Sequence, residues 1–235
     1  MGLRLRHFAL TSATLIRRLS ERPPVTDVLD KTARSQRKAK GSGHLRRAEI
    51  IEAASLIFIE CGYEGATIRK IADAVGVSST ALYMHFSDKS EILVEICENA
   101  FALLLAQNTE IAALQMEPVA RVRLLLAAYM SFALEHPHAY QLVFCTAGSA
   151  LPPERTEALG ELGRRCYDLF LGAVGKIGAA GLLKSGDTDA AAQTLWAATH
   201  GLAALLITRP TFEWRPSETL QSMMLDALFD GLVTT

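Results

Sequence analysis

Residues 67–86 read TIRKIADAVGVSSTALYMHF, and this segment predicts two short helices joined by a tight turn. Apolar residues recur at helical spacing on both sides of Gly76, which can adopt the positive φ of a sharp turn. Thr67 and Ser78 offer hydroxyl groups that can cap the first amides of the two helices. Ala72 is small enough to let the helices approach closely. The pattern is typical of a helix-turn-helix unit, whose second helix enters the major groove of DNA.

Longer amphipathic segments flank this unit on both sides. The preceding helix begins near His44 and is expected to end at Gly62, which acts as a C-terminal cap. Ser87 or Asp88 is expected to cap the following helix, which extends to Leu114. The apolar face of the preceding helix carries Ile50, Ala54, Ile57, Phe58 and Cys61.

The rest of the chain is also expected to be helical. Prolines and glycines mark the breaks between segments, including a glycine-rich stretch from Gly172 to Gly186. The sequence has no strand of alternating pattern and no internal repeat. We therefore predict an all-α fold, in which a short three-helix head precedes a larger bundle. Helices are predicted at 119–135, 138–147, 154–179, 188–208 and 216–233.

The net charge of −1 hides an uneven distribution along the chain. Residues 1–47 contain 12 lysines and arginines and 3 acidic residues, a formal charge of +9. The remaining 188 residues contain 12 and 22, a formal charge of −10. A basic end favours binding to a polyanion, and the acidic remainder argues against a nucleic-acid surface along the whole chain.

The leader at residues 1–43 is interpreted as a disordered tail, or as the product of a translation start placed too far upstream. Pro23 and Pro24 interrupt it, and Gly-Ser-Gly ends it. Two weaker interpretations stay open: a signal peptide over the apolar residues 8–16, and an amphipathic Arg-rich targeting segment.

Several classes of function lack the residues that they require. Nucleotide-binding, zinc-protease and nucleophile-elbow motifs are absent, so we expect no enzymatic activity, no catalytic residue and no cofactor. No apolar run reaches the roughly 18–20 residues that span a bilayer, and we expect a cytoplasmic protein without membrane contact. No C-x-x-C motif is present, so we expect no metal site and interpret the cysteines as buried free thiols. These cysteines are Cys61, Cys97, Cys145 and Cys166.

Over residues 44–97 the sequence resembles the tetracycline-repressor (TetR) family of transcriptional regulators. The elements that carry this resemblance are TIRxIA, GVS and LYxHF, in that order, followed by Lys89 at the family's spacing. The resemblance implies a helix-turn-helix DNA-binding domain at 44–90. It also implies a ligand-binding and dimerisation domain of about six helices at 91–235.

The resemblance further implies which side chains meet DNA. Thr67, Tyr83, His85 and Lys89 match positions that hold phosphates. Arg69, Ser78, Ser79, Thr80 and Ala81 match positions that face the groove. Arg46 and Arg47 lie where the first helix approaches the DNA backbone.

Other interpretations of these residues stay open. Tyr83 can be a half-buried packing residue, and His85 a hinge residue at the surface. Ser79 and Thr80 can simply begin a helix. Lys89 occupies the first turn of a helix, where the dipole disfavours a cation; a phosphate or neighbouring carboxylates would offset that cost.

Residues 196–201 read WAATHG and are similar to the Trp-His-Gly element of one C-terminal subclass of the family. The family resemblance implies a variable pocket for a small molecule in this half. His200 is either a polar group within that pocket or a hydrogen-bonded histidine of the core or an interface. The aromatic residues either line the pocket or form plain core. They are Phe101, Tyr129, Phe132, Tyr140, Phe144 and Trp196.

DNA geometry favours a homodimer, because two recognition helices about one turn apart gain both affinity and specificity. The last two long helices are the predicted interface, where two copies would form a four-helix bundle. The predicted interface residues are Leu195, Ala198, Leu202, Leu205, Met224, Leu228 and Phe229.

The sequence therefore predicts a DNA-binding transcriptional regulator. It is expected to be a repressor whose affinity for a pseudo-palindromic double-stranded operator changes when a largely apolar small molecule binds. The alternative is a small-molecule binding or interaction protein that has lost DNA binding.

Overall fold

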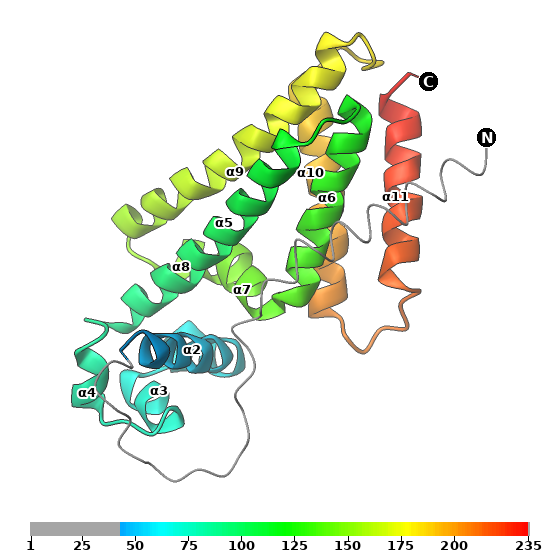
Figure 1. Cartoon of the computed structure of the whole chain (residues 1–235). Helices are drawn as coiled ribbons and strands as arrows, with labels where there is room; N and C mark the ends of the chain where they lie inside the picture. Colours follow the sequence, from blue (N-terminus) through cyan, green and yellow to red (C-terminus); the bar gives the residue numbers. More distant parts are fainter. Residues whose placement is uncertain (1–42, 235) are drawn as a thin grey trace. The chain divides into compact units, whose positions relative to one another are not determined.

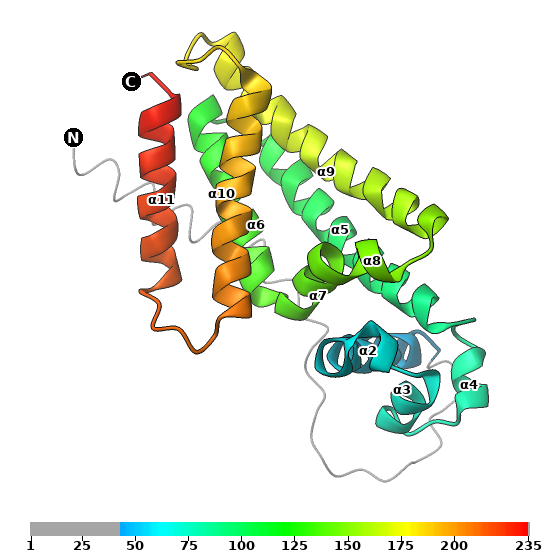
Figure 2. The same ribbon diagram turned by 180° about the vertical axis from the view of Figure 1, so that it is seen from behind.

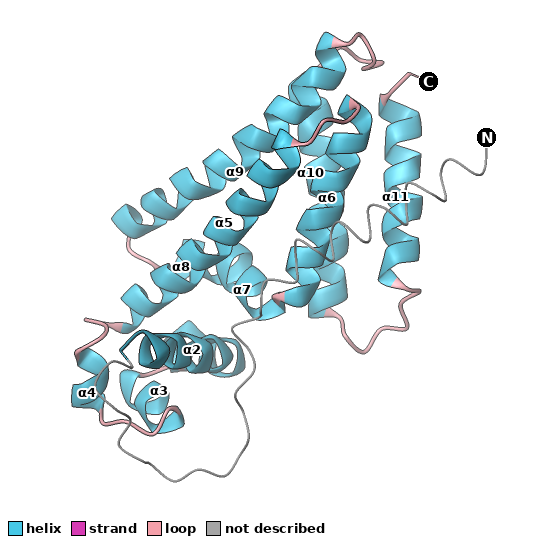
Figure 3. Cartoon of the chain, viewed as in Figure 1, coloured by secondary structure: helices cyan, strands magenta, loops and turns pink. Residues whose placement is uncertain are grey.

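The computed structural model describes residues 43–234, and the elements in that range are helices (Figure 3). Within it there is no strand, and one isolated antiparallel bridge joins Leu183 and Val233. The all-α prediction is confirmed. The leader predicted at 1–43 lies outside the described residues, apart from its last glycine.

The described residues form two compact units. The boundary between these units does not lie at residue 90, where the family resemblance places it. The first, named here the head unit, comprises residues 43–100 and 138–160. The second, the bundle unit, comprises residues 101–137 and 161–234. The division differs because a segment far along the chain packs on α2 (Gly43–Gly65), the helix that precedes the helix-turn-helix.

The head unit begins with α2 (Gly43–Gly65), α3 (Ile68–Ala74), α4 (Ser79–Tyr83) and the first part of α5 (Lys89–Ala113) (Figure 1). Gly62 breaks the regular path of α2 with a φ of 70°, and Gly76 turns the chain between α3 and α4 with a φ of 68°. Both glycines occupy the left-handed region that favours glycine. Side chains buried in this unit include Ile50, Phe58, Ile71, Leu82, Phe86 and Ile92.

A second segment completes the head unit. It consists of α7 (Pro137–Gln141), the π-helix η1 (Leu142–Thr146), α8 (Ala147–Ala150) and the start of α9 (Pro153–Ala179). η1 packs against α2. The single helix predicted at 138–147 is therefore wrong in detail, because the wider turns of η1 interrupt it.

The bundle unit contains α6 (Pro118–Glu135), α10 (Thr188–Thr208), α11 (Ser217–Leu232) and the later parts of α5 and α9. α10 contacts both α6 and α11, as Figures 1 and 2 show from opposite sides. An apolar core joins these helices. Its most buried members include Ile111, Val122, Val174, Ile177, Ala192 and Leu195.

The predicted break from Gly172 to Gly186 is shorter than expected. α9 continues to Ala179, so Gly172, Gly175 and Gly178 are helical. A Cβ at Gly178 would lie 2.9 Å from the hydroxyl oxygen of Thr188, so this glycine permits close packing against the start of α10.

The interpretation of the cysteines as buried thiols is only partly correct. Cys97 is buried, and burial raises the pKa of its thiol to about 12. Cys61 and Cys145 are exposed, because the faces of α2 and η1 that carry them point to solvent.

Candidate nucleic-acid interface

Two hydroxyl caps fix the ends of the helix-turn-helix unit. The Thr67 hydroxyl oxygen accepts a hydrogen bond of 3.2 Å from the Lys70 amide and begins α3. The Ser78 oxygen accepts one of 3.1 Å from the Ala81 amide and begins α4. Both caps were expected from the sequence. They position the N-terminal end of α4, from Ser78 to Ala81, which is called its leading edge below.

The leading edge of α4 and its neighbours face solvent in the head unit. The Tyr83 residue is 55% exposed and the Arg69 side chain 86% exposed, although Asp73 lies 3.9 Å from the Arg69 guanidinium. Ser79 and His85 are half-buried. These side chains are placed where a DNA duplex can reach them. The other exposed members of the predicted contact set are Thr67, Ser78, Thr80 and Ala81.

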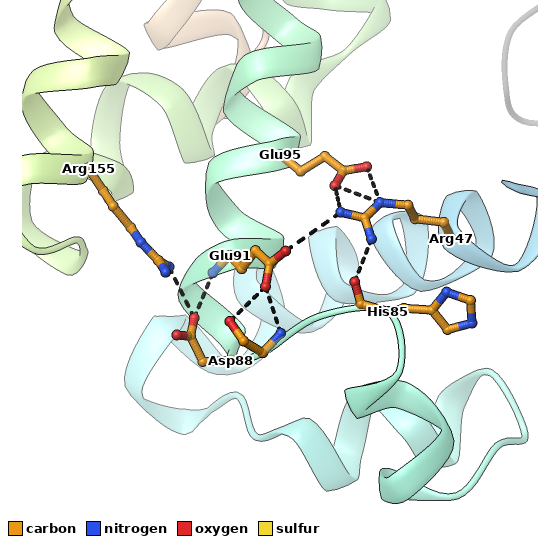
Figure 4. Close-up of polar contacts among 7 residues, drawn as sticks. Arg47, His85, Asp88, Glu91, Glu95 and Arg155 are labelled. Atoms are coloured by element: carbon orange, nitrogen blue, oxygen red, sulfur yellow. Dashed lines mark hydrogen bonds and ion pairs between the residues drawn. The ribbon is translucent and has the colours of Figure 1, made fainter. Parts of the chain in front are cut away.

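Arg47 does not face that surface. Its Nε donates to both carboxylate oxygens of Glu95 at 2.9 and 2.8 Å, and a terminal nitrogen donates to the carbonyl of His85 (Figure 4). The guanidinium also lies 4.0 Å from the centre of the Phe86 ring. The hydrogen bonds to Glu95 raise the pKa of Arg47. Glu95 balances the charge of Arg47 inside the head unit, and the predicted DNA contact of Arg47 stays a prediction.

Arg46 and Lys89 also bind within the chain. Arg46 donates to the carbonyl of Val75 at 3.3 Å, where α3 ends, and pairs with Glu49 at 2.9 Å. The Lys89 ammonium donates to the carbonyl of Tyr63 at 2.7 Å and lies 4.2 Å from the Tyr63 ring centre. These cations meet C-terminal carbonyls, as the helix dipole favours. Their predicted phosphate contacts stay predictions. Such contacts would have to use the N–H groups that are not already bound within the chain.

Carboxylates hold the first turn of α5 in place. Asp88 accepts a hydrogen bond from the Glu91 amide at 2.7 Å, while Glu91 accepts from the amide and hydroxyl of Ser87 at 2.6 and 2.7 Å. These bonds lower the pKa of Glu91. Burial raises the pKa of Asp88, but hydrogen bonds from Ser90, the Glu91 amide and Arg155 outweigh it and leave the pKa below its usual value.

No pattern in the sequence indicates the partner that α9 supplies to this turn. Arg155 pairs with Asp88 at 3.1 Å (Figure 4), and it also donates to the Ser90 hydroxyl. The two residues are 67 positions apart, so no local pattern links them. The pair joins the starts of α5 and α9, two helices that continue into the bundle unit.

The predicted pocket residues are divided between the two units. Tyr140 and Phe144 lie in the head unit, where their ring centres are 4.9 Å apart. Phe101 and Phe132 are buried in the bundle unit. The remaining three come together across α6 and α10 in the bundle unit, and they are Tyr129, Trp196 and His200.

The predicted dimer residues differ in their availability. Leu195 and Phe229 are buried in the core of their own chain, so they cannot face a partner, and their prediction is corrected. Leu205 is 48% exposed on α10. Met223, which was not predicted, is 67% exposed on α11. The half-buried members are Ala198, Leu202, Met224 and Leu228.

Both halves of the chain match family models. Residues 50–96 match the model described as "Bacterial regulatory proteins, tetR family". Residues 122–231 match the model described as "Tetracyclin repressor-like, C-terminal domain". The chain belongs to the TetR family. Neither description names the Trp-His-Gly subclass, which stays a prediction.

Individual TetR-family proteins are similar to parts of the chain. The "HTH-type transcriptional repressor KstR2" of Mycobacterium tuberculosis is 33% identical over 107 residues, 46% of this chain and 53% of that protein. The "HTH-type transcriptional activator FasR" of Mycolicibacterium smegmatis is 30% identical over 99 residues, 42% of this chain and 45% of that protein. The chain thus matches about half the length of these curated relatives.

A solved structure extends the likeness of fold. The "ketosteroid transcriptional regulator KstR2 of Mycobacterium tuberculosis" superposes with a TM-score of 0.67. The match covers 81% of this chain and 96% of that chain at 22% identity. At this identity the likeness establishes the TetR-like fold alone.

We predict opposite effects for two arginines of the head unit. Arg47→Met removes a partly screened, hydrogen-bonded ion pair and should lower the free energy of unfolding by about 1–2 kcal/mol. The melting temperature should fall by roughly 2–8 °C. The slope of log affinity against log salt for a nonspecific DNA duplex should stay unchanged.

Arg69→Met is the matched control, since this side chain is exposed. It should leave the melting temperature unchanged and reduce the salt slope by about one. Thermal unfolding and fluorescence anisotropy measure the two quantities. A reduced salt slope with an unchanged melting temperature for Arg47→Met would show that Arg47 contacts DNA phosphates.

Proposed function

We propose that the protein is a DNA-binding transcriptional repressor whose operator affinity changes when a small molecule binds to the bundle unit. The observation that carries the proposal is the exposed leading edge of α4, which Ser78 caps and which follows the turn at Gly76. Membership of the TetR family supports the same function. Relatives include both repressors and an activator, so the sign of regulation belongs to the proposal.

The proposed DNA contact divides the head residues into two roles. Ser79, Thr80 and Ala81 would face base edges, where short side chains fit the major groove. Arg69 and Tyr83 would bind phosphates, which position a protein on the duplex. Arg46, Arg47 and Lys89 would chiefly hold the helices that present this edge.

Dimerisation would place two such edges on one operator. α10 and α11 contact each other and carry exposed apolar side chains that include Leu205 and Met223. α10 is also long and apolar enough to pass for a membrane span by length and composition, with a mean hydropathy of 1.3. A partner's α10 and α11 would cover this surface and explain its composition. The proposed location is accordingly the cytoplasm.

Regulation would require the effector to bind two arrangements of the protein unequally. A coupling of about 1–3 kcal/mol is typical of such regulators. α5 and α9 each contribute residues to both units, so a change in either helix within the bundle unit continues into the head unit.

We predict that Tyr83→Phe weakens binding to the operator upstream of the protein's own gene. Loss of a hydrogen bond to a charged phosphate costs about 1.5–3 kcal/mol, roughly 10- to 150-fold in affinity. Met84→Leu, at the adjacent exposed position, should bind as the native protein does. Footprinting locates the operator and anisotropy gives the affinity. Absence of any footprint at low salt would instead favour a protein that binds small molecules without binding DNA.

We predict that Leu205→Asp yields monomers. A carboxylate in the centre of an apolar interface loses its hydration without gaining a partner. Leu134→Asp is the control, because Leu134 is exposed to a similar degree on α6, outside the proposed interface. Sedimentation velocity should give a monomer for the first variant and a dimer for the second. A dimer for both variants would place the interface elsewhere.

A further inference from the structure

A connected cluster of polar aromatic side chains lies on three helices of the bundle unit. The hydroxyl of Tyr129 on α6 lies 2.9 Å from Nδ1 of His200 on α10. Trp196, one turn before His200, has its ring centre 5.9 Å from the imidazole. The ring of Tyr167 on α9 lies 5.5 Å from that of Trp196. Because Trp196 is 40% exposed, the cluster can be reached from solvent.

Tyr167 carries an unsatisfied polar atom within this cluster. Its hydroxyl is fully buried and has no hydrogen-bond partner. A buried hydroxyl without a partner costs free energy, so native proteins rarely retain one without a reason. A bound molecule that supplies the missing hydrogen bond would account for it.

The charges around the cluster define what such a molecule can be. Burial lowers the pKa of His200, so the imidazole is neutral at physiological pH. Burial raises the pKa of Tyr167, and the nearby carboxylates of Asp189 and Asp168 raise it further. These two carboxylates disfavour a bound anion beside the Tyr167 hydroxyl.

The arginines of the adjacent α6 make contacts within the bundle unit, although the buried Nε of Arg121 has no hydrogen-bond partner. Arg121 donates to the carbonyls of Ile111 and Ala112 at 3.0 and 2.7 Å, where α5 ends. Arg123 pairs with Asp226 at 2.7 Å. An acidic effector at this cluster would meet two neutral hydroxyls and a neutral imidazole.

A second buried polar atom of the bundle unit has the same character. Gln107 on α5 is only 8% exposed, and its side-chain oxygen has no partner. α5 and α9 contact each other near Phe101, whose carbonyl lies 3.7 Å from the sulfur of Cys166. Gln107 follows Phe101 by six residues, about 9 Å along the helix. Its oxygen can accept a hydrogen bond from the hydroxyl group of an alcohol.

We propose that Tyr167, together with Tyr129 and His200, binds an uncharged carbonyl or hydroxyl group of an otherwise apolar effector, and that Trp196 packs against its apolar body. Hydroxyl groups both donate and accept, so the cluster suits either a ketone or an alcohol. The inference rests on the proposed function and specifies its ligand class: a neutral ketone or alcohol, as opposed to a carboxylic acid or an acyl thioester bearing phosphates.

The test uses the intrinsic fluorescence of Trp196. The chain contains two tryptophans, so Trp214→Phe makes Trp196 the only reporter. The probes form two pairs, each with one neutral ketone and one carboxylate on the same linear chain or ring of twelve carbons. The pairs are dodecan-2-one with dodecanoate, and cyclododecanone with cyclododecanecarboxylate. At least one ketone should quench Trp196 saturably, and it should bind at least tenfold tighter than its carboxylate.

Two variants then assign the recognition to hydroxyl groups. Tyr167→Phe and Tyr129→Phe should each weaken ketone binding by roughly 3- to 10-fold, as expected for one hydrogen bond. Tyr63→Phe, which alters a hydroxyl in the head unit, is the control and should not change it. Equal or tighter binding of the carboxylates would overturn the ligand class. Unchanged ketone affinity in Tyr167→Phe, or no quenching by any probe, would overturn the site.

Measuring operator binding and ketone binding on the same protein tests the proposed function and this inference independently. Operator binding is measured by anisotropy without any probe. Selective ketone binding by a protein that binds no operator would retain the ligand site and reject the repressor. Operator binding without ketone selectivity would retain the repressor and reject the ligand class.

Discussion

The ion pair between Arg47 and Glu95 is the interaction on which the arrangement of helices in the head unit depends. It joins α2 to α5, and the same guanidinium binds the carbonyl of His85, which immediately follows the recognition helix. One side chain thus links three segments, in addition to the apolar core of the head unit. The short α4 has few internal hydrogen bonds of its own, so its orientation comes from such tertiary contacts.

The residues that the family resemblance assigned to phosphates show what sequence cannot reveal. Arg46, Arg47 and Lys89 are cations near a DNA-binding motif, and composition alone favours phosphate as their partner. The partners that the fold supplies are carbonyls at helix ends and a carboxylate 48 residues away. The positive charge of an arginine or a lysine is evident from the sequence. The direction in which its long side chain points depends on packing.

The fold was predictable where a local rule decides the outcome. The caps at Thr67 and Ser78, the turn at Gly76 and the bounds of α10 all follow from hydroxyl capping, positive φ and helical periodicity. The π-helix and the division into units were not predictable, because both depend on how η1 packs on α2. The aromatic residues considered for the pocket divide between the two units for the same reason: helical spacing identifies an apolar face but does not say which helix packs against it.

An uncharged effector places a physical demand on the mechanism of regulation. It cannot act on DNA through a long-range electrostatic field, so its influence must pass through a change of conformation. α9 meets this demand, because it carries both Tyr167 of the bundle cluster and Arg155, which binds the capping Asp88 of α5. These two residues are twelve positions apart, about 18 Å along one continuous helix. Under the proposed function, a shift of α9 on effector binding would therefore also displace Arg155, which binds Asp88 immediately before α5.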